Sequence, residues 1–141
     1  MLSESQETLY FGKGGIMTII QHVRETLGLD STSTDFEAEV KMLINASLSI
    51  LIQNGIGKPN FELSDTSTWD DFKDPIAKGN EQFSLVPTYV YLKTKLAFDP
   101  PPQLSTVEFY KEYTAEVLWR LSAAYELSTL REEVNTDEFH G

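Results

Sequence analysis

The side chains that could do chemistry are few and scattered along this sequence. Its two histidines, His22 and His140, are too far apart to argue for a shared site, and the Glu-x-x-His pair of di-iron helical bundles is missing. His22 falls on the polar side of a helical pattern and His140 is next to last, so we expect both imidazoles to be solvated. Cysteine is absent, which excludes disulfides, Cys-ligated zinc and thiol catalysis.

Carboxylates are more numerous, but their spacing does not build a site. A calcium loop that starts at Asp30 needs Gly at its sixth position and Glu at its twelfth, where the chain has Asp35 and Lys41. Asp70 and Asp71 could serve a metal-assisted hydrolase only inside a pocket that perturbs their pKa values, and the sequence predicts no such pocket. We therefore expect no catalytic residue, no cofactor and no metal, and we do not expect an enzyme.

The balance of charge limits the partners that the chain can bind. It has 141 residues, with 22 acidic side chains against 11 basic ones and a formal net charge of −11. DNA and anionic membranes attract basic surfaces, so binding by phosphate neutralisation is not expected. Hydrophobic residues make up 40% of the chain, enough for one folded domain. No stretch approaches the roughly 18 apolar residues of a membrane span.

Two segments in the first half of the chain show helical spacing of apolar residues. Residues 17–27 form the first, with Thr18 as its expected N-cap. The second spans about 36–54 and ends at the glycine that follows. Thr34 and Glu37 have the spacing of a capping box, so we expect them to start this helix.

Two further helices are predicted in the second half. Apolar residues cover nearly the whole surface of the segment 83–98, which has a proline in its first turn, so this helix should be central. The fourth helix is expected to start with a cap at Ser105 or Thr106. Trp119 does not lie on the apolar face of this helix, so its side chain is free to meet a neighbouring molecule.

A long acidic loop separates the second helix from the third. Regular structure is weak over about residues 55–80, where acidic residues outnumber lysines. Residues 68–72 are the exception, because they predict one short helical turn with Trp69 and Phe72 folded back on the core. The expected fold class is all-α, a small bundle of about four helices with this one long loop. We divide the chain into a flexible leader (1–16), a helical domain (17–127) and an acidic C-terminal tail (128–141).

Several short motifs are shared with one family of phage proteins. Residues 89–101, YVYLKTKLAFDPP, resemble the helix and F-D-P-P turn of the small head–tail connector (adaptor) proteins of tailed bacteriophages and prophages. The turn itself comprises Phe98, Asp99, Pro100 and Pro101. The resemblance extends over about 17–125, because the following motifs agree with the family in order and spacing: the start of the first helix, the G-x-G at 55–57, T-W-D-D-F at 68–72 and W-R-L at 119–121.

This resemblance implies a structural virion protein without catalysis or cofactor. Such proteins assemble as a ring of about twelve copies, a closed cyclic assembly. The ring docks under the portal at the capsid vertex, meets a tail-side connector or stopper protein, and extends the DNA channel without binding DNA specifically. The implied location is the head–tail junction of the virion, with assembly in the host cytoplasm and no membrane partner. The alternative is a non-catalytic helical binding module, such as a phage regulator or assembly chaperone.

A head-to-tail ring needs two different patches on every copy. We expect these patches to draw on the loop and on the third and fourth helices. Burial in the monomer core would explain the same aromatic residues, and a solvated face would explain the charged ones. The candidate interface residues are Trp69, Asp70, Asp71, Phe72, Lys93, Lys95, Trp119 and Arg120.

Overall fold

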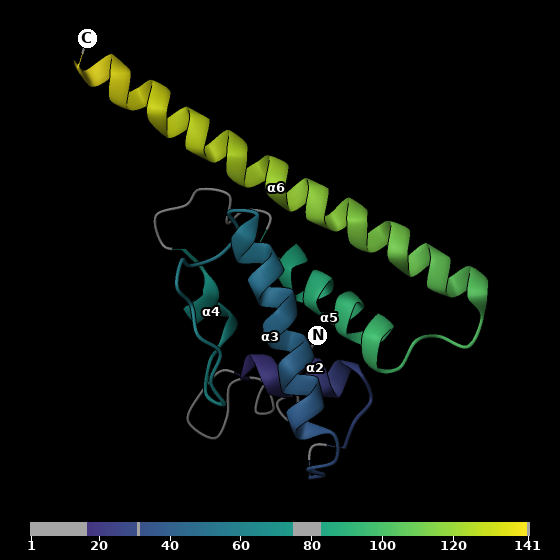
Figure 1. The fold of residues 1–141 in the computed structure, drawn as a ribbon. Helices are drawn as coiled ribbons and strands as arrows, with labels where there is room; N and C mark the ends of the chain where they lie inside the picture. Colours follow the sequence, from purple (N-terminus) through teal and green to yellow (C-terminus); the bar gives the residue numbers. More distant parts are fainter. Residues whose placement is uncertain (1–16, 31, 75–82, 141) are drawn as a thin grey trace, which may run out of the picture.

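The computed structural model describes residues 17–30, 32–74 and 83–140, with side chains described as far as residue 127. Within these ranges the protein is all-α, which confirms the predicted fold class (Figure 1). The leader expected over 1–16 lies outside the described residues. None of the described helices is long and apolar enough to cross a membrane. The helices are α2 (Ile19–Thr26), α3 (Glu37–Gln53), α4 (Trp69–Phe72), α5 (Leu85–Phe98) and α6 (Leu104–His140).

Helix α5 is the centre of the bundle, as its apolar surface predicts. It packs against α3, against α6 and, over a shorter length, against α2. Tyr89 and Val90 are buried in this position, and Pro87 lies in the first turn, where its missing N–H is harmless. The helix ends at Phe98, and Lys95 forms an ion pair with the C-cap residue Asp99 at 2.9 Å.

The start of α3 differs from the expected capping box. The N-cap residue is Phe36, in the left-handed conformation at φ 59°, and no side chain caps the helix, so the roles predicted for Thr34 and Glu37 are wrong. The turn is held instead by the buried Arg24, whose guanidinium donates to the carbonyls of Ser33 and Asp35 at 2.9 and 3.2 Å. Tertiary contacts thus replace the local cap.

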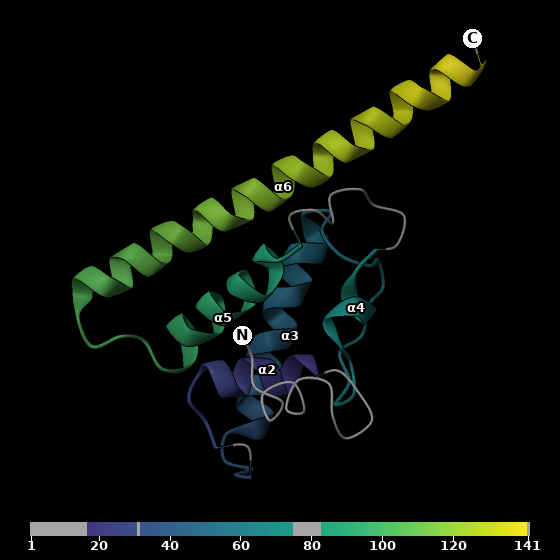
Figure 2. The same cartoon turned by 180° about the vertical axis from the view of Figure 1, so that it is seen from behind.

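Helix α6 is longer than its apolar pattern predicts. It begins at Leu104, so the caps predicted at Ser105 or Thr106 are wrong, because both residues lie inside the first turn. Thr106 and Val107 donate their backbone N–H groups to the Gln103 carbonyl. It continues to His140, through the segment expected to be an acidic tail. In both views its C-terminal end projects beyond the other helices (Figures 1 and 2). The division of the chain at residue 127 stays a prediction.

Candidate interface

The acidic loop is fixed to the start of α2 by paired backbone and side-chain contacts. Ile19 N–H donates to the Ser67 carbonyl at 2.8 Å, within an isolated antiparallel bridge between Thr18 and Thr68. Both threonines are N-caps of capping boxes, so two helix starts lie side by side. The carboxylate of Asp71 accepts the Thr68 N–H at 2.9 Å, which gives this predicted interface residue a capping role.

Trp69 connects the loop to α2 through its side chain. The indole Nε1 donates to Nδ1 of His22 at 3.0 Å, and the two rings meet edge to face. The expectation that His22 is solvated is therefore wrong: the imidazole is half-buried beneath the loop. Burial lowers the pKa of His22 below its ordinary 6.5, and the nearby Glu25 carboxylate partly offsets this effect.

Phe72 belongs to the core of the monomer. Its side chain is fully buried, with its ring 5.1 Å from that of Phe61 and 6.4 Å from that of Phe83 between centroids. Gly57 passes so close beneath this ring that a Cβ there would collide with it. The short helical turn predicted for 68–72 is confirmed, but Phe72 is not available to a partner in this fold, because the aromatic cluster covers it.

The charged groups of the loop form local ion pairs. Asp70 pairs with Lys73 at 3.4 Å, and Asp65 pairs with Lys41 of α3 at 3.0 Å. All four side chains are at least 40% exposed, so each pair contributes at most about 1 kcal/mol to stability. Among the described residues, no group of three or more His, Asp or Glu side chains is arranged to hold a metal ion.

The candidate residues on α5 and α6 differ in accessibility. Lys93 and Lys95 are half-buried, and Lys95 is committed to Asp99 in the turn after α5. Trp119 is 70% exposed on the outer side of α6. Arg120 beside it forms an i,i+4 ion pair with Glu116 at 3.0 Å. The structure therefore brings Trp69, Asp70 and Asp71 together in the loop and leaves Trp119 and Arg120 on a different element.

The sequence of the chain matches the model of a known protein family. The model of the phage connector protein family matches residues 19–128, which is most of the chain and nearly the whole bundle. The chain belongs to the phage connector protein family. No curated protein and no solved structure matches it. The family is one of structural proteins, so the connector has a structural role in the phage, assembles with other phage structural proteins and is a virion component.

The connector also exposes large apolar side chains that were not among the predicted interface residues. Met42 on α3 is 65% exposed, and Phe36 is 57% exposed although the helical pattern placed it on the buried face. Met42 falls between the buried positions Val40 and Ile44, so its departure from the apolar line was a usable signal. Phe36 gave no such signal, because it continues the apolar spacing of α3 although it is the N-cap residue and its ring lies edge-on against Phe98.

Proposed function

We propose that this connector assembles as a ring of about twelve copies that joins the portal at the capsid vertex to the tail. The family match over residues 19–128 carries this proposal. The 70% exposure of Trp119 supports it, since tryptophan is among the residues that most often anchor a protein interface. The ring meets the portal on one side and a tail-side connector or stopper on the other.

The charge of the chain suits a DNA conduit. A net charge of −11 on every copy gives a ring an acidic surface, which repels phosphate and lets DNA pass without specific binding. In the described part of the loop, exposed Asp65, Asp70 and Asp71 add to this charge. The connector is thus a non-catalytic channel segment of the head–tail junction, built in the host cytoplasm during virion assembly.

Electron microscopy of the purified connector mixed with the portal protein tests this function. We expect a ring of connector density coaxial with the portal and attached to its tail-proximal face. The alternative function, a helical module that captures an amphipathic segment of a regulator or chaperone client, predicts a connector monomer or dimer and a bare portal. A bare portal at connector concentrations well above micromolar would contradict the proposal.

A further inference from the structure

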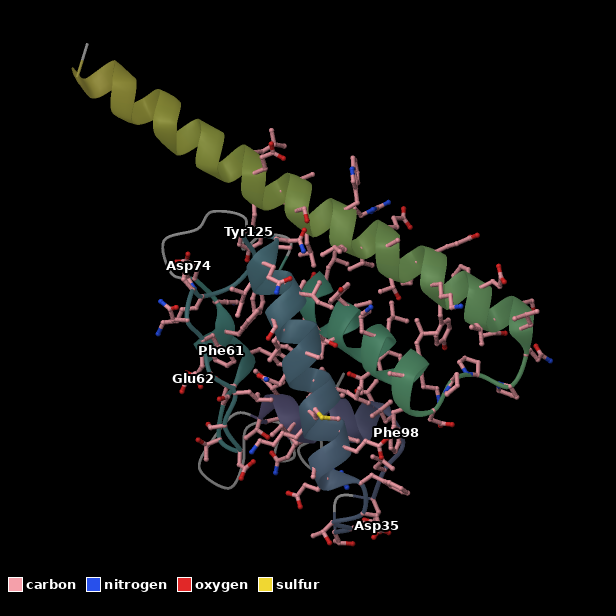
Figure 3. The ribbon with its side chains drawn as sticks, in the orientation of Figure 1. Asp35, Phe61, Glu62, Asp74, Phe98 and Tyr125 are labelled. Carbon is pink, nitrogen blue, oxygen red and sulfur yellow. The ribbon has the colours of Figure 1, made fainter. Side chains whose placement is uncertain are left out.

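A groove runs along the outer side of α3, between this helix and the loop segment that precedes α4. Its volume is about 520 Å³. Its lining is mixed: apolar Met42, Phe61 and Leu63 lie beside polar and charged side chains, and Met42 is 65% exposed. Phe61 and Glu62 line the groove from the loop, and Figure 3 shows both residues next to α4. Lys41, Met42, Ser49 and Glu62 line this groove.

The outer face of α6 carries a side chain of complementary shape. Trp119 is the largest exposed apolar residue of the described part of this helix, and it is flanked by Glu116 and Arg120. Helices α3 and α6 both pack on α5, and no residue of the groove belongs to α6. A single copy of the chain therefore presents the groove and Trp119 at the same time.

We infer that Trp119 of one copy inserts into the α3 groove of the next copy. This inference rests on the proposed ring and names its contact. The indole covers the exposed Met42, and aromatic rings and thioether sulfurs attract each other. Because the two surfaces are different, the contact is head-to-tail, and an open chain of copies keeps one free groove at one end and one free tryptophan at the other until the ring closes.

The charges around the two surfaces are complementary. The groove carries Lys41 and Glu62, and the α6 face carries Glu116 and Arg120. In the single chain, Arg120 pairs with Glu116, and Lys41 pairs with Asp65 at 3.0 Å. In the contact, Arg120 reaches Glu62 and Glu116 reaches Lys41. Exposed intramolecular pairs contribute little to stability, so giving them up costs little, and charge pairs across an interface fix its register and its choice of partner.

Site-directed cross-linking tests this contact without background, because the chain has no cysteine. Ser49→Cys places a thiol in the groove, and Ala115→Cys places one on the exposed face of α6 one turn before Trp119. The two single variants are mixed, with and without the portal, and treated with a short bis-maleimide. We expect cross-linked dimers only in the mixture, and a ladder of oligomers from the double variant. Gln103→Cys, exposed at the start of α6, replaces Ala115→Cys in the matched control.

Adding Trp119→Ala to the Ala115→Cys variant should reduce the yield of cross-linked dimer by about tenfold or more, as the loss of an interface anchor does. Arg120→Glu should reduce it as well, and Glu62→Arg in the partner variant should restore it. Cross-linking of Ala115→Cys to itself would show a symmetric contact and overturn the inference. Yields no higher than with Gln103→Cys would also overturn it. Rings seen on the portal in that case leave the proposed function intact, whereas a bare portal refutes the function separately.

Discussion

The indole N–H of Trp69 donates to Nδ1 of His22 over 3.0 Å, and this bond joins the acidic loop to α2 across 47 positions of the chain. Nδ1 can accept this hydrogen bond only when it carries no proton. The bonded imidazole is therefore neutral, with its proton on Nε2. Together with the Ile19–Ser67 backbone bond, it makes the loop part of the folded unit.

Replacing Trp69 by Ala should lower the free energy of unfolding by about 2 kcal/mol, because a half-buried ring and one hydrogen bond are lost. The circular dichroism of the native monomer should stay nearly unchanged, since the main helices pack elsewhere. Urea denaturation measures the effect, and Trp119→Ala is the control. The exposed Trp119 should change monomer stability by less than about 0.5 kcal/mol. Equal losses at the two positions would contradict this assignment.

Acid should weaken the fold through His22. Its pKa in the folded state lies below the ordinary 6.5, so the unfolded chain binds its proton first. The stabilisation is complete above pH 6.5 and decreases as the pH falls from 6.5 towards the folded-state pKa. The Asp30 carboxylate loses its contribution to stability at lower pH than His22 does, because hydrogen bonds from Thr32 hold its pKa below the ordinary 3.8.

Urea midpoints near pH 7.5 and near pH 5.5 measure this effect, because the interval spans the ordinary titration of histidine. We expect the midpoint of the natural chain to fall more over this interval than that of His22→Gln, whose amide oxygen can still accept the Trp69 N–H. An identical fall in both proteins would show that His22 is not the group responsible.

Gly57 should tolerate substitution less well than Gly55. Both have positive φ, 90° and 79°, so Ala at either position costs about 1–2 kcal/mol in backbone strain. At Gly57 the new methyl group also collides with the Phe72 ring, whereas the space at Gly55 is open. Thermal unfolding should therefore show a clearly larger loss for Gly57→Ala. Equal melting temperatures would mean that Phe72 moves aside without cost.

Thr94 carries a fully buried hydroxyl on α5 that has no hydrogen-bond partner among the described residues. Thr94→Val keeps the shape and removes the unpaired group, so the free energy of unfolding should rise by about 1 kcal/mol. Thr114→Val is the matched control, because Thr114 donates to the Tyr110 carbonyl at 2.6 Å and should lose stability. A loss at both positions in denaturant titrations would show that Thr94 is satisfied.

The elements that sequence reasoning located well are those fixed by local chemistry. Helix α5 is bounded by a proline in its first turn and the F-D-P-P turn at its end, and α3 stops at the positive φ of Gly55. The cap of α3 was predicted wrongly because Arg24, which is 9 and 11 positions from the carbonyls that it holds, and the Phe36–Phe98 ring contact replace a local cap. Propensity and spacing contain no term for such contacts.

The candidate interface residues also divide into those whose position the local sequence indicates and those whose contacts form only in the folded chain. Trp119 stood off the apolar line of its helix and is exposed, as its position indicated. Phe72, in the same short motif as Trp69, folds back on the core as expected, and Phe61 and Phe83 cover it there. The partner of His22 lies in a loop with no periodicity, so no spacing rule could have paired it with Trp69.

The number of connector chains bound to one portal shows whether the protein forms the proposed ring. Native mass spectrometry of the portal, alone and with an excess of this 16.0 kDa chain, measures that number. We predict a single added mass step equal to about twelve chains, with few partly filled portals, because a ring is complete only when every head-to-tail contact is made. An unchanged portal mass, or the addition of one or two chains only, would contradict it.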